Sequence, residues 1–160
     1  MERVLGLDPG SRVTGWGLVT GTRQRVESVE YGCIMPPRGA SRPVKLAALA
    51  DGLAAMLERL YPEVVAVETS FFSRNPRSAL ALAESRGALL ATLGRWGGEV
   101  VEYEPARVKA AVVGHGRAEK KQVSFVVQRL LGLAAVPPED AADALALACC
   151  HLWRGRLDGC

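Results

Sequence analysis

The chain has 160 residues and a formal net charge of +3, and 49% of its residues are hydrophobic. This length is typical of one globular domain that buries enough surface to fold without disulfides or a structural metal. No stretch reaches the apolar length of a membrane helix, and the four cysteines lack zinc-site spacing, so we expect a cytoplasmic protein with reduced thiols and no membrane partner.

The first third of the chain is predicted to form three strands in an antiparallel meander. Apolar runs at residues 3–8, 13–20 and 25–34 have the length of short strands, and turn-forming residues separate them. Residues 43–60 repeat apolar side chains at helical spacing, which predicts an amphipathic helix. The continuous apolar run EVVAVE at 63–68 then predicts a strand that is buried on both faces.

The rest of the chain alternates helix and strand and then ends in helices. Residues 76–95 are rich in Ala and Leu and begin with Pro, which favours the first turn of a helix, and residues 99–103 form a fifth strand. Three more helices are predicted, a short one from Pro105 and two over residues 118–132 and 138–153. This order predicts an α/β chain with a mixed sheet, as one domain over 1–154 with a frayed tail at 155–160.

Basic residues are concentrated in the middle of the chain. Residues 71–129 carry 10 Lys and Arg against 5 Asp and Glu, whereas residues 1–70 carry 8 of each kind. A basic segment inside a nearly neutral chain favours a negatively charged partner such as nucleic acid.

Two acidic residues end predicted strands. Asp8 follows the run VLGL and Glu68 follows VVAV, so both lie where open α/β sheets bind ligands, at the carboxyl ends of the strands. Turn formation is an alternative reason for Asp8, because Asp, Pro and Gly at 8–10 are all common in turns. A carboxylate beside four apolar residues, as at Glu68, is costly to desolvate unless a positive group pairs with it.

Two further acids stand three residues apart on the last predicted helix. Asp140 and Asp143, in the segment PPEDAADALALACC, therefore project from one helix face. Asp140 lies in the first turn, where an acid stabilises the helix dipole by about 0.3–1 kcal/mol. Asp143 has almost only apolar neighbours, and a lone ionised carboxylate is excluded from such surroundings or neutralised in them.

Together these acids predict a metal site. Carboxylates that are brought together without cations repel one another. No Lys or Arg stands next to Asp8, Glu68 or Asp143 in the sequence. A cation from a distant part of the chain is an alternative partner for them. Oxygen ligands suit Mg²⁺, with Mn²⁺ able to substitute. Two such ions about 4 Å apart can activate water and stabilise the leaving oxygen in phosphodiester hydrolysis, so we expect two ions per active site.

Four segments resemble the RuvC-type Holliday-junction resolvases, a family of the ribonuclease H and retroviral-integrase superfamily. They are GLDPGSRVTGWG, AVETSFFSRNPRSALALAESRG, ARVKAAVVGHGRAEKKQV and DAADALALA, and they span almost the whole chain. The resemblance implies a ribonuclease H-like fold, in which a five-stranded mixed sheet with its first three strands antiparallel carries helices on both faces. It also identifies the catalytic metal ligands as Asp8, Glu68, Asp140 and Asp143.

The same resemblance implies an activity and its partners. The family acts as a homodimer that nicks two opposed strands of a four-way DNA junction during recombination and repair. The ends can be ligated, and the core sequences that it prefers contain thymine. A branch-migration helicase complex is a further partner that only the family implies. We therefore expect a crossover junction endodeoxyribonuclease.

Candidate DNA contacts follow the strand that ends in Glu68 and lie in the basic segment. The family's stacking aromatic matches Phe71, and its basic DNA contacts match Lys109 and Lys120. Neighbouring basic residues that we add as candidate contacts are Arg74, Arg77, His115, Arg117 and Lys121. The alternative for Phe71 is a ring packed in the core. The alternative for the basic residues is a solvated surface that binds no ligand. Stacking on an unpaired base is worth roughly 1–3 kcal/mol. The family resemblance favours this role for Phe71 and a core position for Phe72.

The predicted helix at 76–95 has a candidate dimer face of small residues, Ala79, Ala83 and Gly87. Core packing explains most of the apolar surface of this helix, but small residues also let two helices approach closely. A two-fold dimer through this face would place two active sites symmetrically on a two-fold junction.

Other classes of function stay open from the residues alone. A non-catalytic junction-binding module shares the fold, but loss of catalysis usually removes acids, and none is missing here. An actin-like or sugar-kinase-type nucleotide-binding protein also has Asp and Gly in its first hairpin, but it needs two related lobes, and this chain has no internal repeat and no GxxxxGK[ST] loop. Only the family resemblance separates the chain from a related nuclease that acts on RNA.

Overall fold

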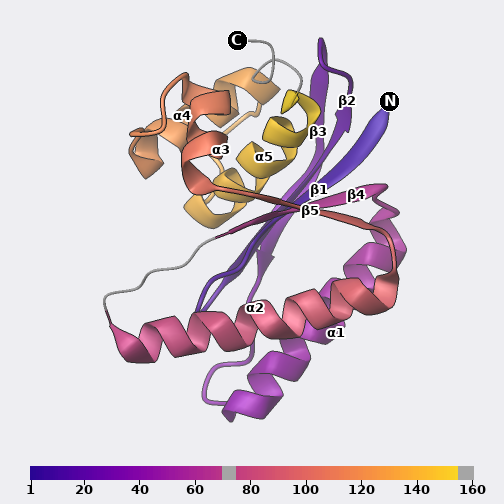
Figure 1. Ribbon diagram of the computed structural model, residues 1–160, viewed down its shortest axis with the longest axis vertical. Coiled ribbons are helices and arrows are strands. Elements are labelled where there is room, and N and C mark those ends of the chain that lie inside the picture. The colour runs from indigo at the N-terminus through magenta and orange to yellow at the C-terminus, as the bar shows by residue number, and fades with distance from the viewer. Residues whose placement is uncertain (70–74, 155–160) are drawn as a thin grey trace.

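The computed structural model describes residues 1–69 and 75–154, which form a five-stranded sheet between two layers of helices (Figure 1). The strands are β1 (Glu2–Asp8), β2 (Thr14–Gly21), β3 (Val26–Ile34), β4 (Val64–Glu68) and β5 (Glu99–Tyr103). The helices are α1 (Arg42–Leu60), α2 (Pro76–Trp96), α3 (Pro105–Val113), α4 (Lys120–Leu131) and α5 (Glu139–Leu152). The predicted mixed sheet with helices on both faces is confirmed.

The strand order β3-β2-β1-β4-β5 explains where a site can form. The first three strands pair antiparallel, whereas β4 lies parallel to β1 and β5 lies parallel to β4. Parallel neighbours need a crossover, and α2 connects β4 to β5 in this way. The carboxyl ends of β1, β4 and β5 therefore share one edge of the sheet, the edge at which open α/β sheets bind ligands.

Each face of the sheet has its own core. Leu5 and Leu7 of β1 pack in one cluster with side chains of α1 and α2, and Val4 packs in the other with side chains of α3, α4 and α5. The Ala-rich helix α5 lies directly on β1 and β2 and is buried along almost its whole length. Even so, no helix in the described ranges combines the length and apolar character needed to cross a membrane.

Two glycines allow α5 to lie this close to the sheet. A Cβ at Gly6 would stand 1.7 Å from the carbonyl oxygen of Ala144, and a Cβ at Gly15 would stand 2.0 Å from that of Asp140. Gly15 is the direct partner of Asp8 in the β1–β2 ladder. The close approach therefore brings the first turn of α5 to the end of β1.

Helix ends differ from the predictions by only a few residues. The helix predicted at 118–132 begins at Lys120, because Glu119 precedes it as N-cap and its N–H donates to Oε1 of Gln122 at 2.9 Å. The helix predicted to begin at residue 76 does so, because Oδ1 of Asn75 accepts a 2.9 Å hydrogen bond from the N–H of Arg77.

Candidate active site

A cavity of about 230 Å³ at the carboxyl edge of the sheet brings three of the four predicted acids together. Its lining residues are Asp8, Glu68, Pro105, Val108, Lys109, Lys120, Val123, Asp143 and Ala146. Asp8 ends β1, Glu68 ends the neighbouring parallel strand β4, and Asp143 comes from α5. Asp140 is outside this lining, but it lies close enough for its charge to act on the ionisation of Asp8 and Asp143.

Burial and mutual repulsion make these acids hard to ionise. Burial first, and then the charges of the neighbouring carboxylates, with Asp143 the largest of these, raise the pKa of Asp8 to about 8. Burial also raises the pKa of Asp143 to about 6, although the charge of Lys120 opposes it. The pKa of Glu68 is raised by burial too, against a smaller lowering effect of Lys109 and Lys120. A bound cation relieves such a group of carboxylates.

Lys120 partly neutralises the acids. Its Nζ lies 3.8 Å from Oδ2 of Asp143, and its side chain is 63% exposed. Burial by itself lowers the pKa of Lys120, but the charges of Asp143 and Asp8 outweigh this effect and raise the pKa. The ammonium group is therefore charged at neutral pH. It does not balance the cluster, because the pKa values of Asp8 and Asp143 stay high beside it.

The donor atoms of the four acids fit a hard divalent cation. They are all carboxylate oxygens, the ligands that Mg²⁺ and Mn²⁺ prefer. As the side chains lie, however, no group of three or more His, Cys, Asp or Glu within residues 1–69 and 75–154 is arranged to hold an ion. The acids are gathered at one cavity and would have to turn toward a common point to share a metal.

Two of the predicted DNA contacts belong to the lining of this cavity, and four others lie outside it. Lys109 and Lys120 line it, from α3 and α4. The predicted contacts that are exposed and outside its lining are Arg77, His115, Arg117 and Lys121. Phe71 and Arg74 lie outside the described residues.

The predicted dimer face lies on the outer side of α2. Ala83 and Gly87 are exposed, and Ala79 is half-buried. A Cβ at Gly87 would have no atom within 4 Å, and the neighbouring Leu80 is 62% exposed. This face of α2 is therefore open to a partner helix.

Sequence reasoning missed the role of Arg86. From α2, its Nη1 donates a 2.6 Å hydrogen bond to the carbonyl oxygen of Glu68, and its Nη2 donates one of 3.0 Å to Oε1 of Glu102. The side chain is only 14% exposed. An arginine in an Ala- and Leu-rich helix is the signal for such a contact, because a buried guanidinium needs acceptors. Arg86 therefore fixes the end of β4 at Glu68, which is one of the predicted metal ligands.

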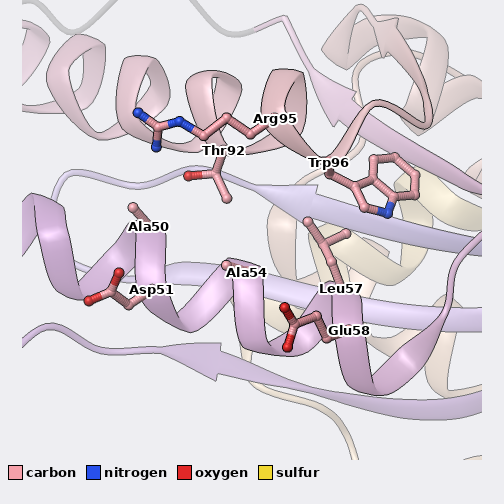
Figure 2. A pocket seen from close by; sticks show the side chains of 8 residues that line it. All are labelled: Ala50, Asp51, Ala54, Leu57, Glu58, Thr92, Arg95 and Trp96. Atoms are coloured by element: carbon pink, nitrogen blue, oxygen red, sulfur yellow. The ribbon is translucent and has the colours of Figure 1, made fainter.

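A second cavity, of about 260 Å³, lies between α1 and α2 (Figure 2). Its lining residues are Ala50, Asp51, Ala54, Leu57, Glu58, Thr92, Arg95 and Trp96. The hydroxyl of Thr92 is already used, because it donates a 2.9 Å hydrogen bond to the carbonyl oxygen of Ala88. None of the predicted site residues lines this cavity, so it is separate from the candidate active site.

Comparison with known proteins shows the family of this chain. A family model described as crossover junction endodeoxyribonuclease RuvC matches residues 4–151. The chain is 47% identical over 156 residues to crossover junction endodeoxyribonuclease RuvC of Syntrophomonas wolfei, which covers 97% of this chain and 91% of that protein. It is 48% identical over 157 residues to the protein of the same name from Alkalilimnicola ehrlichii, and this match covers 98% of this chain and 94% of that protein.

The fold also matches a solved structure. T. thermophilus RuvC in complex with a Holliday junction substrate superposes with a TM-score of 0.85 and 29% sequence identity, over 98% of this chain and 96% of that chain. The ribonuclease H-like fold predicted from the sequence is thereby confirmed. On the match of the family model and the identity to these relatives, the chain belongs to the RuvC family of crossover junction endodeoxyribonucleases.

Proposed function

We propose that this chain hydrolyses two opposed strands of a four-way DNA junction at the cavity lined by Asp8, Glu68 and Asp143. One observation carries the proposal: carboxylates from β1, β4 and α5, far apart in the sequence, meet in one cavity with Lys109 and Lys120. The T. thermophilus relative, whose fold this chain shares, was solved with a Holliday junction substrate. That observation supports the same class of substrate for this chain.

The RuvC family acts with a divalent metal. We assign the binding of Mg²⁺, as two ions per active site with Mn²⁺ able to substitute, to Asp8, Glu68, Asp140 and Asp143. When bound, such ions supply an activated water and stabilise the leaving oxygen of the phosphodiester. The raised pKa values of Asp8 and Asp143 support this assignment, because they indicate carboxylates that lack sufficient positive charge in the protein alone.

The two lysines of the cavity are assigned to the phosphate that is cleaved. A DNA backbone is repelled by four acids, so cations beside them are needed to bring a phosphate close. Lys120 suits this role because its side chain is 63% exposed and makes only a 3.8 Å contact with Asp143. When the acids turn to a metal, its ammonium group is free to turn to a phosphate oxygen. Lys109 approaches the same cavity from α3.

Recognition of the junction is assigned to the other candidate DNA contacts. Phe71 would stack on an unpaired base at the junction centre, and basic side chains would meet phosphates of the arms. The basic residues with this assignment are Arg74, Arg77, His115, Arg117 and Lys121. A homodimer through Ala79, Ala83 and Gly87 would present two cavities to two strands. A branch-migration helicase as a partner stays a prediction from the family resemblance.

Cleavage of a synthetic four-way junction tests the proposal. An end-labelled junction is incubated with Mg²⁺ or Mn²⁺, beside a linear duplex of the same sequence and a control in EDTA. We expect paired symmetric nicks that are confined to the junction and lost in EDTA. Tight binding without nicks in either metal would instead indicate a non-catalytic junction-binding module.

The assignment of the acids needs its own variant. Asp8→Asn removes a charge and a metal ligand but no DNA contact, so we expect loss of cleavage with junction binding kept or tightened. Asp51→Asn is the matched control, because Asp51 is an exposed carboxylate in the separate cavity between α1 and α2. Cleavage by Asp8→Asn at the wild-type rate would refute the assignment.

A further inference from the structure

A basic cavity of about 410 Å³ lies between the β1–β2 turn, the β3–α1 loop and the start of α1. Its lining residues are Ser11, Arg12, Val13, Met35, Pro36, Pro37, Arg38, Arg42 and Lys45. Four of these side chains are cations, and no carboxylate is among them. Like charges that face one cavity repel one another, so a lining of this kind favours an anionic ligand.

Of the four cations, only Arg42 has a side-chain partner in the part of the chain that the structure describes. Arg42 is held by α2, because its guanidinium donates to Glu84, to the carbonyl oxygen of Ala81 and to Oγ of Ser85. The other three form no ion pair and no side-chain hydrogen bond within residues 1–69 and 75–154. They are Arg12, Arg38 and Lys45. Their charges are therefore available to a ligand.

The basic cavity lies at the same edge of the sheet as the acids. Arg12 belongs to the turn that begins after Asp8, and the ladder pairs run from Asp8 to Gly15 and from Gly15 to Cys33. Cys33 stands two residues before Met35, which lines the cavity. Burial, and then the charge of Asp140, raise the pKa of the Cys33 thiol, so the acids act across this part of the edge.

The two basic groups flank the acids on opposite sides. Lys109 and Lys120 line the cavity of the acids together with Glu68, which ends β4, and Pro105, which follows β5. The basic cavity is instead built from the β1–β2 turn, the β3–α1 loop and the start of α1. A polyanion that crosses the edge at Asp8 meets cations before and after the acids. A single phosphate would need only one of the two groups of cations, so the presence of both favours a polyanion.

We propose that the cavity lined by Arg12, Arg38 and Lys45 is a phosphate-binding subsite for the DNA strand that passes the acids, on the side opposite Lys109 and Lys120. The subsite rests on the proposed junction cleavage and adds to it the path of the strand across the sheet edge. The start of α1 contributes to it, because the first turn of that helix contains no acid and its N-cap, Ser41, forms no side-chain cap. Met35 and Pro36 supply an apolar wall for the sugars between phosphates.

The test measures binding of a labelled four-way junction as a function of salt. The variant Arg12→Ala/Arg38→Ala/Lys45→Ala is placed in an Asp8→Asn background, so that no strand is cut during the titration. Each phosphate contact contributes about 0.9 to the slope of log affinity against log salt concentration, so the slope should fall by about 2–3. We expect the affinity at about 0.1 M salt to fall roughly tenfold or more.

A second triple variant controls for the change in net charge. Arg23→Ala/Arg25→Ala/Arg95→Ala removes three exposed cations from the β2–β3 turn and the end of α2, at the other end of the sheet. We expect this variant to keep a slope close to that of the parent. Equal losses in the two triple variants would overturn the subsite, because they would show a general effect of charge.

Junctions in which single backbone phosphates are replaced by uncharged linkages show which phosphate the subsite binds. Junctions with a single methylphosphonate at successive positions are titrated with the parent and with the Arg12→Ala/Arg38→Ala/Lys45→Ala variant. Neutralisation on one side of the cleaved linkage should weaken the parent and leave the variant unchanged, whereas equal effects at every position would overturn the proposal. If inorganic phosphate competes with the junction but no methylphosphonate position separates the parent from the variant, the cavity is a site for free phosphate. This result would also overturn the proposal.

The outcome separates this inference from the proposed function. Wild-type protein is assayed for junction cleavage in parallel with the binding titrations. If it nicks junctions while the two triple variants bind alike, the subsite is wrong and the activity stands. If it does not nick junctions in Mg²⁺ or Mn²⁺, the proposed activity itself fails.

Discussion

Nη1 of Arg86 lies 2.6 Å from the carbonyl oxygen of Glu68, so one side chain of α2 is tied to the end of β4. The outer face of the same helix carries the exposed residues Ala83 and Gly87, through which we propose that two copies associate. A shift of α2 in the dimer contact would therefore reach the acid that ends β4 through this hydrogen bond.

Replacement of this arginine should impair catalysis more than binding. In Arg86→Ala the end of β4 loses a hydrogen bond from a charged donor, which is worth about 1.5–3 kcal/mol of unfolding free energy. We expect turnover to fall roughly tenfold, since a less fixed Glu68 holds metal poorly, while junction affinity changes little. Single-turnover cleavage and binding titrations check this, with Arg95→Ala on the same helix as control. A parallel loss of affinity would show that Arg86 contacts DNA instead.

The sequence predicted the acids of the site better than their neighbours. Asp8 and Glu68 end apolar runs, and the order of helices and strands places the ends of such runs at one edge, so local pattern and topology were sufficient. Arg86 was missed because one of its acceptors is a backbone carbonyl, which is present at every residue, and the other is the carboxylate of Glu102, which is 16 residues away in the sequence. The contact depends on how α2 crosses the sheet.

The basic cavity was missed for a related reason. Arg12, Arg38 and Lys45 come from a turn, a loop and a helix, in a part of the chain whose charges balance, so no charge run marks them. The close approach of α5 to Gly15 was equally hidden, because glycine next to a turn also has a local explanation. Contacts between distant segments decide both features, and they require the packed structure.

Stability without metal should fall as pH rises from about 4 to about 8. The carboxyl group of Asp8 has a pKa of 3.8 when unperturbed and about 8 in the folded protein, where burial raises it first of all. Between these values the folded state binds more protons than the unfolded state, so the unfolding free energy decreases with pH. Urea unfolding in EDTA at pH 5 and pH 8 checks this. The loss, on the order of a few kcal/mol, should shrink in Asp8→Asn and persist in Asp51→Asn.

Mg²⁺ should reverse this loss. A cation that binds only the folded protein stabilises it by about 2.7 kcal/mol at a concentration 100 times its dissociation constant. Protons compete for Asp8, so Mg²⁺ should raise Tm more at pH 8 than at pH 5. Thermal unfolding with and without Mg²⁺ measures the effect in wild type and Asp143→Asn. An equal rise in both proteins at both pH values would speak against binding by these acids.

Gly15→Ala should loosen the contact between α5 and the sheet. The added methyl would stand 2.0 Å from the carbonyl oxygen of Asp140, so the first turn of α5 has to move away from Asp8. We expect a loss of about 1–3 kcal/mol of stability and reduced cleavage. Gly94→Ala is the matched control, because a methyl there meets open space and helix propensity favours it by about 0.5–1 kcal/mol. Full activity of Gly15→Ala would mean that α5 can shift without effect on the acids.

A charge on the outer face of α2 should separate the two copies. In Ala83→Arg a long cation replaces an exposed methyl at the proposed helix contact, and burying it against a second copy without a partner is costly. We expect sedimentation to show a dimer for wild type and a monomer for this variant, and we expect junctions cut by the variant to receive unpaired nicks in single strands. Ala55→Arg makes the same change on an exposed alanine of α1 and should stay dimeric. If Ala83→Arg stays dimeric and cuts both strands together, the copies must associate through another surface.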